Sequence, residues 1–582
     1  MLDGLNDQQK EAVISSGNVL LTACPGSGKT RVLTYKVAYE LQNIGSKEVV
    51  AALTFTNRAA EEIKKRVDFL DIDAGKLWAG TIHAFCLEWI LYPYSGYLPE
   101  LKNGFVIVDE YKVEDLLTQL KAELNLSKFT RVTTRLKSDG QFVDTNLANH
   151  ELLTLYHDTL KKERLIDFDQ MLYLSFKLLD TYPKIGKALN NLFKLICVDE
   201  YQDTQDLQYR ILAKIISARS NHTRIFFVGD KDQAIYESLG GVAKTLQQIK
   251  VEFGNIEIQE LNLSGNYRST QRSIDYYKNF QTADIDIQSV CDYAQEQGEI
   301  TLDQTTHHTD LSETISNLIS INLANGIPEK EICVLAPQWW MVIPMGRKLK
   351  MLLPNVSFDA IGLSPLVKSK ENIWFKFARL FLVDPAPNMY FVRSRWANEL
   401  LDVLDSLGLY LFSEKERRAK CLLKAINSIK SSKDDGLEYL EECFVLLMKQ
   451  MDVDVDSYPN LLIHWKYFFE GTKKRLDNVQ NNYARDLKSF KALFYHKNGV
   501  VVNTCHGIKG EEFHTVICFG LLENYVPNSG ESNPETAANK LLYVICSRAK
   551  KHLHLIAETG RDTHWKSFPT TYKLSDVQFT YD

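Results

Sequence analysis

The 582-residue chain is too long for one hydrophobic core and predicts about three to four domains. Its net charge of −6 excludes a polybasic coat, although a local basic groove for nucleic acid remains compatible with it. The ten cysteines form no CxxC pair, which argues against a zinc or iron–sulfur site and favours reduced, buried thiols. The first residues, MLDGLNDQQK, lack the features of a signal peptide, and no apolar run approaches ~20 residues, so we expect a cytoplasmic protein without a membrane segment.

The residues Leu5 to Gln9 precede a short predicted helix that runs to Val13, with Asp7 as its candidate N-terminal cap. Gln9 lies shortly before a glycine-rich loop. A glutamine amide can both donate to and accept from the edge of adenine, so Gln9 is a candidate base-reading residue. An ordinary surface glutamine has the same sequence signal, and this alternative stays open.

The glycine-rich loop follows the short apolar run Val19 to Leu21 and precedes a predicted helix that contains Val32 and Leu33. This order of strand, loop and helix is the context that a phosphate-binding P-loop requires. The glycines allow backbone N–H groups to face phosphate oxygens, the lysine reaches the β- and γ-phosphates, and the threonine hydroxyl binds Mg²⁺. The candidate ATP-binding residues are Cys24, Pro25, Gly26, Ser27, Gly28, Lys29 and Thr30, with Ala23 in place of the usual first glycine.

Two further strands are predicted downstream of the loop. Val49 to Phe55 is an apolar run that places Phe55 at the carboxyl end of a strand, where ligands bind in open α/β sheets. Gly80 to Phe85 repeats this pattern with His83. A lone histidine is more often structural than functional, so the sequence leaves the role of His83 open.

Two strands end in an acidic pair, and only one of them fits the P-loop. Phe105 to Glu110 ends in Asp109-Glu110, and Leu195 to Glu200 ends in Asp199-Glu200. The second run is joined by one predicted helix to the strand at 225–232, which completes a βαβ unit. We therefore assign Asp199 to Mg²⁺ and Glu200 to the attacking water, with Gln233 beside the γ-phosphate, and we interpret Asp109-Glu110 as a solvated turn.

A second α/β pattern follows a strand that ends at Tyr267-Arg268, a pair suited to stacking on a base and neutralising phosphate charge. It begins at Ile332 to Leu335 and resumes at 500–503, 516–519 and 552–556. Mostly helical stretches at 92–190 and 366–495 interrupt the two α/β patterns.

The ordered motifs resemble those of UvrD/Rep-like superfamily 1A helicases across nearly the whole chain. They read LNDQQ, ACPGSGKTR, ALTFTNRAA, GTIHAFC, VDEYQDTQ, VGDKDQAIY, NYRST, TCHGIKGEEF and LLYVICSRA. The resemblance implies an α/β fold of two RecA-like P-loop motor domains with two mostly helical insertions. The implied parts are motor domain 1A (1–91 and 191–262), insertion 1B (92–190), motor domain 2A (263–365 and 496–582) and a reduced insertion 2B (366–495).

The resemblance also implies roles for single residues. Gln9 would read adenine, Arg31 and Tyr267 would pack on it, and Glu512 would lie near the ribose. Gln233, Arg268 and Arg548 would contact the γ-phosphate, the two arginines from the far side of a cleft. Residues on the path of single-stranded DNA would be Phe55, His83, Phe168, Tyr236 and His506, with the aromatic rings stacking on bases.

Some positions depart from the family pattern. Ser238 and Leu239 stand where the family has a stacking tryptophan and an arginine, and Ala336-Pro337-Gln338-Trp339 replaces its Tyr-Arg-Ser-Asn stretch. The second insertion lacks the Thr-Pro-x-Arg-Gly-Ile-Gly signature for duplex binding. We therefore expect a weak grip on DNA, for which Trp339 or the neighbouring Trp340 would compensate unless both are core residues.

The resemblance favours an ATP- and Mg²⁺-dependent 3′→5′ helicase or translocase that acts on single-stranded DNA. A narrower resemblance, to the helicase subunit of Gabija-type anti-phage systems, suggests an alternative. In that alternative the chain is a DNA- or nucleotide-sensing ATPase that activates a partner nuclease of the OLD family with little unwinding. A P-loop transport or signalling ATPase is a third possibility, against which the aromatic residues of the DNA path argue.

Overall fold

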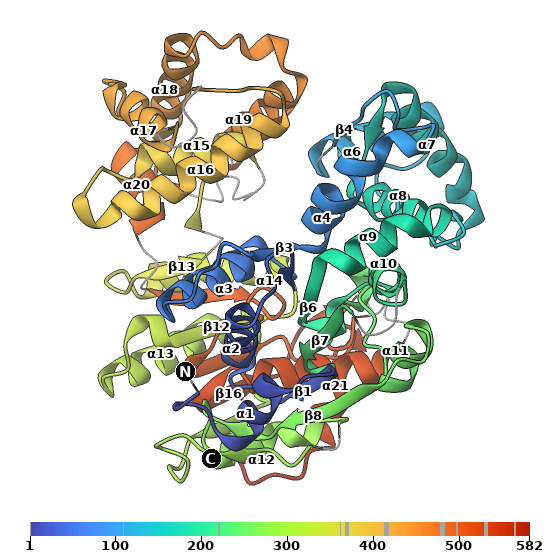
Figure 1. Ribbon diagram of the computed structural model, residues 1–582. Helices are drawn as coiled ribbons and strands as arrows, with labels where there is room; N and C mark the ends of the chain where they lie inside the picture. The colour runs from blue at the N-terminus through green and yellow to red at the C-terminus, as the bar shows by residue number, and fades with distance from the viewer. Residues whose placement is uncertain are drawn as a thin grey trace.

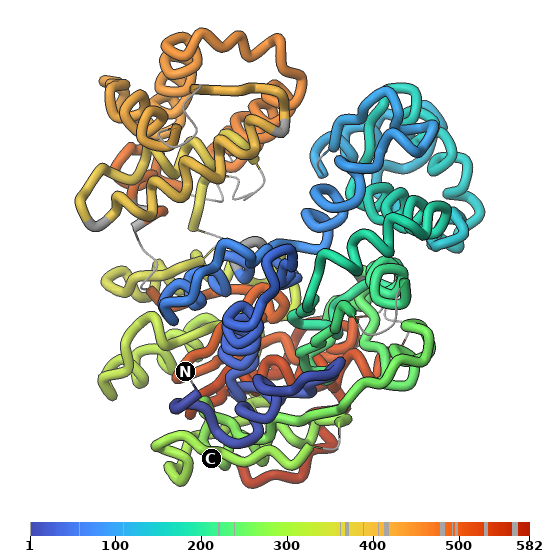
Figure 2. The backbone as a smooth tube through the Cα atoms, in the orientation of Figure 1, coloured from blue at the N-terminus to red at the C-terminus, as the bar shows by residue number. Residues whose placement is uncertain are grey.

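The computed structural model of the chain describes residues 2–108, 110–218, 222–283, 285–360, 363–366, 372–412, 418–477, 483–495, 499–528, 533–563 and 566–582. Figure 1 shows two α/β bodies at the base of the molecule and two helical bodies above them. The backbone trace in Figure 2 leaves the first α/β body for one helical body and then returns to it. The second helical body interrupts the second α/β body in the same way.

The first sheet consists of six parallel strands in the order β3-β2-β6-β7-β1-β8. Leu20 of β1 packs into the core on one face of this sheet, and Val19 and Leu21 pack into the core on the other. Burial on both faces explains the near-continuous apolar runs from which the strands were predicted. The strands are β1 (Asn18–Ala23), β2 (Val49–Thr54), β3 (Leu77–Thr81), β6 (Phe193–Asp199), β7 (Arg224–Gly229) and β8 (Ile258–Leu263).

Helices cover both faces of the first sheet, as in doubly wound α/β folds. One face carries α1 (Asp7–Ile14), α2 (Lys29–Gln42) and α3 (Asn57–Phe69), and the other carries α10 (Asp206–Ile216) and α11 (Leu246–Glu252). The prediction that Asp7 caps α1 is wrong. The side chain of Asn6 accepts a hydrogen bond from the backbone N–H of Gln9, and the Gln9 side chain accepts one from the backbone of Asn6.

The first helical body joins β3 to β6. Its chain continues from α4 through a π-helical segment, Cys86–Leu91, into α5. The strand that precedes the acidic pair at 109–110 is only two residues long and pairs with β5, outside the six-stranded sheet. This placement supports our choice of the other acidic pair, although Asp109 itself lies outside the described residues. The elements are α4 (Ile82–Phe85), α5 (Tyr92–Tyr94), β4 (Val106–Ile107), α6 (Glu110–Glu123), α7 (His150–Glu163), β5 (Leu165–Ile166), α8 (Phe168–Thr181) and α9 (Pro183–Leu192).

The second sheet is also parallel and six-stranded, in the order β11-β16-β15-β12-β14-β13. The sequence analysis anticipated its four inner strands. It did not find the edge strands β11 and β13, which are short and contain few consecutive apolar residues. The strands are β11 (Ile300–Asp303), β12 (Ile332–Ala336), β13 (Phe358–Ala360), β14 (Val500–Thr504), β15 (Phe513–Phe519) and β16 (Ala549–Ile556). The principal helices around this sheet are α12 (Gln271–Tyr277), α13 (Leu311–Ala324), α14 (Trp339–Leu352), α21 (Pro534–Cys546) and α22 (Tyr572–Ser575).

The second helical body lies between β13 and β14 and has its own apolar core. It contacts the first helical body through Tyr111 of α6, whose ring centroid lies 4.8 Å from that of Tyr467 and 5.1 Å from that of His464. Its helices are α15 (Ile373–Leu382), α16 (Tyr390–Ser406), α17 (Arg418–Ser428), α18 (Gly436–Gln450), α19 (Pro459–Asp477) and α20 (Leu487–Tyr495).

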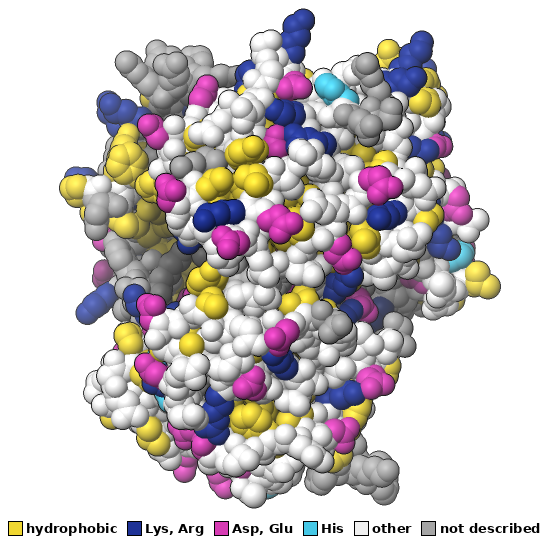
Figure 3. Space-filling view, turned by 60° about the horizontal axis from the view of Figure 1, so that its bottom comes forward, with side chains coloured by type: hydrophobic (Ala, Val, Ile, Leu, Met, Phe, Trp, Pro, Cys, Tyr) yellow, Lys and Arg dark blue, Asp and Glu magenta, His cyan; other side chains and the backbone are white. Residues whose placement is uncertain are grey.

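The surface and the helices agree with the bulk composition. On the face drawn in Figure 3, basic and acidic side chains are interspersed, as the net charge of −6 leads us to expect. Among the described helices, none combines the length and apolar content that a membrane crossing demands.

Candidate active site

The glycine-rich loop lies between β1 and α2 and has the predicted strand–loop–helix geometry. Gly26 and Gly28 have φ angles of 70° and 82°, in the left-handed region that favours glycine. The hydroxyl of Ser27 donates a hydrogen bond of 2.7 Å to the carbonyl of Cys24, which closes the turn. The loop thus brings the N-terminus of α2 and the ammonium of Lys29 to one place, an arrangement suited to binding phosphate.

Replacing Gly26 with Ala should weaken nucleotide binding, because a Cβ at this position would lie 2.6 Å from Cβ of Arg268 and 2.8 Å from Oδ1 of Asn266. The left-handed backbone adds roughly 1–2 kcal/mol of strain for a residue with a side chain. We expect at least a tenfold loss of affinity in a titration with a fluorescent ATP analogue. Gly17→Ala is the matched control, because a Cβ there meets nothing within 4 Å. Equal affinities in the two variants would contradict the close contact between loop and arginine.

The acidic pair lies at the end of β6, directly opposite the lysine of the loop. The ammonium of Lys29 is 3.5 Å from Oε1 of Glu200. Glu200 has a φ of 51°, a conformation that costs about 1–3 kcal/mol in a residue with a side chain and often marks functional sites. Its carboxylate also accepts a hydrogen bond from the amide of Gln202.

The electrostatic surroundings separate the two carboxylates. Burial raises the pKa of Asp199, and the negative charge of Glu200 raises it further. Burial acts on Glu200 in the same direction, but the ammonium groups of Lys29 and Lys509 outweigh it and hold the pKa of Glu200 below its usual range. Glu200 therefore stays ionised at neutral pH.

Gln9 is buried at the back of the glycine-rich loop, which overturns the alternative of an ordinary surface glutamine. Only 2% of its surface is exposed, and its Nε2 donates a hydrogen bond of 3.0 Å to the carbonyl of Ser27. Tyr267 lies close by, because its hydroxyl accepts from Nδ2 of Asn6 and its backbone N–H donates to the carbonyl of Gly26. The guanidinium of Arg31 lies over the ring of Tyr35, 5.7 Å from its centroid.

Contacts between the two α/β bodies meet at the glycine-rich loop and the acidic pair. Arg548, only 2% exposed, donates from Nη2 to Oε1 of Gln233 at 2.5 Å. Lys509 donates to Oδ2 of Asp203 at 2.5 Å and to the carbonyl of Gln233 at 2.7 Å. Burial lowers the pKa of Arg548 to about 9, and the positive charge of Arg268 acts in the same direction. Arg548 is thus still cationic at neutral pH.

Arg268 and Glu512 form an ion pair beside the loop. Nε of Arg268 donates to Oε2 of Glu512 at 2.6 Å, and Nη1 donates to the carbonyl of Ser547 at 3.0 Å. Arg268 was predicted to contact the γ-phosphate and Glu512 to lie near the ribose, and here the two side chains are paired with each other. The role of each with a bound nucleotide stays a prediction.

The predicted DNA-path residues fall into two aromatic groups. Phe55 and Tyr236 stack with a centroid distance of 5.1 Å and an interplanar angle of 12°, and His506 lies 6.3 Å from the Tyr236 ring. His83 and Phe168 form a separate edge-to-face pair at 5.4 Å. Phe55 is 48% exposed and Phe168 46% exposed, so both present ring surface to solvent. The side chain of Ser238 lies outside the described residues.

Apart from Gln233 and Arg548, the sequence analysis missed the residues that join the two α/β bodies. Besides Lys509 and Asp203, an ion pair links Lys540 to Glu237. The buried carboxylate of Asp232 accepts hydrogen bonds from the backbone N–H groups of Thr282 and Ala283. Several of these residues stand inside the quoted motifs, but their partners depend on how the two bodies face each other.

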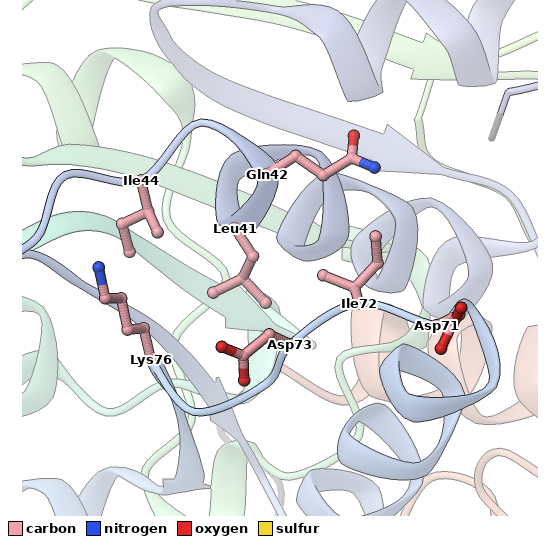
Figure 4. Close-up of a pocket in the computed structure, with 7 residues that line it drawn as sticks. All are labelled: Leu41, Gln42, Ile44, Asp71, Ile72, Asp73 and Lys76. Carbon is pink, nitrogen blue, oxygen red and sulfur yellow. The ribbon is translucent and has the colours of Figure 1, made fainter.

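A small surface pocket lies away from this site. Figure 4 shows it lined by Leu41, Gln42, Ile44, Asp71, Ile72, Asp73 and Lys76. Leu41 and Gln42 end α2, whose first residue is Lys29, so the pocket lies roughly 20 Å along the helix from the glycine-rich loop. We assign it no part in the site.

Comparison with known proteins agrees with this geometry. Residues 5–254 match the family model of the UvrD/REP helicase N-terminal domain, and residues 469–560 match that of the UvrD-like helicase C-terminal domain. The chain belongs to the UvrD-like superfamily 1A helicases.

Curated relatives of this UvrD-like chain include ATP-dependent DNA helicases. The chain is 30% identical to UvrD1 of Mycobacterium bovis over 302 residues, 31% identical to PcrA of Leuconostoc citreum over 299 residues and 30% identical to PcrA of Bacillus subtilis over 296 residues. Each match covers 47% of this chain and 38% of the relative. The matched region therefore spans less than half the length of these relatives.

Proposed function

We propose that this chain is an ATP-dependent DNA translocase and helicase with 3′→5′ polarity. The observation that carries the proposal is the pair of contacts Lys29–Glu200, within the first α/β body, and Arg548–Gln233, between the two bodies, which lie close together because the charge of Arg548 reaches Glu200. The two bodies would be motor domains 1A (1–91 and 191–262) and 2A (263–365 and 496–582). The helical bodies would be insertions 1B (92–190) and 2B (366–495). Closing and opening of the cleft would then move the domains relative to each other.

The residues around the cleft fit an ATP site. The loop with Lys29 would hold the phosphates, Glu200 would orient and deprotonate the attacking water, and Arg268 and Arg548 would stabilise the charge of the transition state. The Thr30 hydroxyl and the Asp199 carboxylate are oxygen ligands of the kind that Mg²⁺ prefers, and the ion would neutralise phosphate charge there. Gln9, Arg31 and Tyr267 would surround the adenine, and Glu512 would lie near the ribose.

The stacked pair Phe55–Tyr236 supports single-stranded DNA as the ligand. Phe55 directly follows β2 and is half exposed, Tyr236 lies in the segment after β7, and the Lys509 ammonium lies 5.0 Å from the Tyr236 centroid. Aromatic faces bind bases and cations bind the phosphate backbone, which together make a sequence-independent site. Because Lys509 also contacts Gln233, the same side chain joins the DNA path to the ATP site.

Phe55→Ala should uncouple ATP turnover from DNA. We expect basal turnover close to that of the wild type, with stimulation by single-stranded DNA largely lost and DNA affinity about tenfold to a hundredfold lower, since one base stack contributes ~1–3 kcal/mol. The measurements are steady-state ATP turnover against DNA concentration and fluorescence anisotropy at a stated salt concentration. Phe69→Ala is the control, because Phe69 lies at the other end of α3 and is 89% exposed. Unchanged DNA stimulation in Phe55→Ala would refute the assigned DNA path.

The departures from the family pattern favour a second candidate function. With Ser238 in place of the stacking tryptophan, a weak grip on DNA would suit a DNA- or nucleotide-sensing ATPase that activates a partner nuclease in the cytoplasm. A Gabija-like anti-phage role with an OLD-family nuclease is one such arrangement. This candidate predicts DNA-stimulated ATP turnover with little unwinding by the isolated chain.

A further inference from the structure

We propose that Trp339 forms an additional base-stacking platform for single-stranded DNA on the second α/β body. The proposal rests on the proposed function and extends the path that Phe55 and Tyr236 begin. It concerns the end of the stretch in which Ala336-Pro337-Gln338-Trp339 replaces the family's Tyr-Arg-Ser-Asn, with Trp340 as the next residue.

The two tryptophans are exposed, which overturns the alternative that both are core residues. Trp339 is 47% exposed and Trp340 is 52% exposed, whereas the next two residues of α14, Met341 and Val342, are buried. A half-exposed indole at the start of a helix presents a flat apolar surface to solvent. Among the described residues, the ring of Trp339 makes no stacking contact with another aromatic ring.

The register of the second sheet places this helix start beside the DNA path. β12 ends at Ala336 and pairs with the end of β14 at Thr504, and the backbone N–H of Cys505 donates to the carbonyl of Ala336 at 3.0 Å. The next residue after Cys505 is His506, which contacts Tyr236. Because neighbouring strands are about 4.8 Å apart, the segment 337–339 leaves the sheet next to His506. The predicted DNA path of Phe55, Tyr236 and His506, of which Tyr236 and His506 are partly buried, would therefore continue toward the exposed Trp339.

Trp340 and its neighbours hold the start of α14 in place. The Trp340 ring packs edge-to-face on Tyr525 at 5.6 Å, and the guanidinium of Arg561 lies 5.7 Å from its centroid. Arg561 is in turn paired with Glu558, which is fully buried and also accepts from the backbone N–H of Gly520 at 2.8 Å. A fixed platform loses little conformational freedom when a base stacks on it.

Cationic side chains lie against the aromatic rings of this row. Lys509 lies over Tyr236 and Arg561 lies over Trp340, and each of these cations is also paired with a carboxylate, Asp203 and Glu558 respectively. Aromatic rings that alternate with cations are the arrangement by which proteins hold single strands without sequence preference. This continuity with the Phe55–Tyr236 stack is why we assign DNA, and not a protein, to Trp339.

The test measures single-stranded DNA binding by anisotropy and by quenching of intrinsic tryptophan fluorescence, with an oligothymidylate as the probe. We expect Trp339→Ala to bind about tenfold to a hundredfold more weakly. Trp339→Phe should bind within about threefold of the wild type, because a ring remains, and should lose part of the quenching. Phe391→Ala, an 82% exposed residue of the second helical body, is the matched control and should bind normally.

The outcomes separate this inference from the proposed function. If Phe55→Ala weakens binding and Trp339→Ala does not, the platform is refuted while the proposed function stands. If the wild-type chain binds no single-stranded DNA, both are refuted. Weak binding by Trp339→Phe as well as Trp339→Ala would also contradict stacking, because it would indicate a structural role; thermal melting of each variant identifies that case.

Discussion

Glu200→Gln should bind ATP and hydrolyse it about 10²–10⁴-fold more slowly than the wild type, because the amide cannot accept a proton from the attacking water. The position of Glu200 opposite the glycine-rich loop suits this role, and Lys29 and Lys509 hold its pKa below its usual range, so that the carboxylate is ionised at neutral pH. Lys29→Ala should abolish turnover through loss of phosphate binding. Single-turnover hydrolysis with bound ATP measures the chemical step directly.

The control for this prediction is Glu110→Gln, in the acidic pair that we interpret as a decoy. Its strand pairs only within the first helical body, so turnover should not change. Near-normal hydrolysis by Glu200→Gln, or a large loss in Glu110→Gln, would show that the wrong acidic pair was chosen.

Arg548→Ala should leave ATP binding largely intact and reduce turnover by about 10³-fold or more, as for other arginines that stabilise a phosphoryl-transfer transition state. Arg548 donates to Gln233 of the first α/β body, so its removal breaks a contact between the second body and the residue that we predict to lie beside the γ-phosphate. Arg548→Lys keeps the positive charge but loses the planar fork, and we expect an intermediate rate. ATP affinity and turnover are measured together on the same preparations.

Because Arg548 is buried, loss of stability must be told apart from loss of catalysis. A variant that melts near the wild-type temperature, binds ATP and fails to hydrolyse it supports the assignment. A variant that is folded and hydrolyses ATP at the normal rate would contradict the two-motor cleft.

Most of the features predicted from the sequence depend on residues that are close together along the chain. The P-loop could be recognised because strand, glycines, lysine and helix are adjacent along the chain. The acidic pair at Asp199-Glu200 could be separated from its decoy because a single helix links it to the next strand. Apolar runs predicted the inner strands of both sheets, since each is buried on both faces.

Features that the sequence analysis did not predict depend mainly on contacts between segments that are far apart along the chain. The partners Lys509–Asp203 are 306 residues apart, and no local pattern encodes their meeting. For Gln9 the sequence left the surface alternative open, and its contact with the glycine-rich loop, which buries it, decides against that alternative. The edge strands β11 and β13 carry too few apolar residues to stand out. Asn6, not Asp7, is the cap because α1 begins at Asp7 itself, one residue earlier than a cap at Asp7 implies.

The most direct test of the proposed function is ATP turnover by the isolated chain, with and without single-stranded DNA, alongside strand displacement on duplexes with a 3′ or a 5′ tail. We predict that single-stranded DNA stimulates turnover and that the chain displaces short strands from the 3′-tailed duplex only. Stimulated turnover without displacement from either duplex would instead favour the sensing ATPase. Turnover that is indifferent to DNA would contradict the assignment of this chain as a DNA-driven motor.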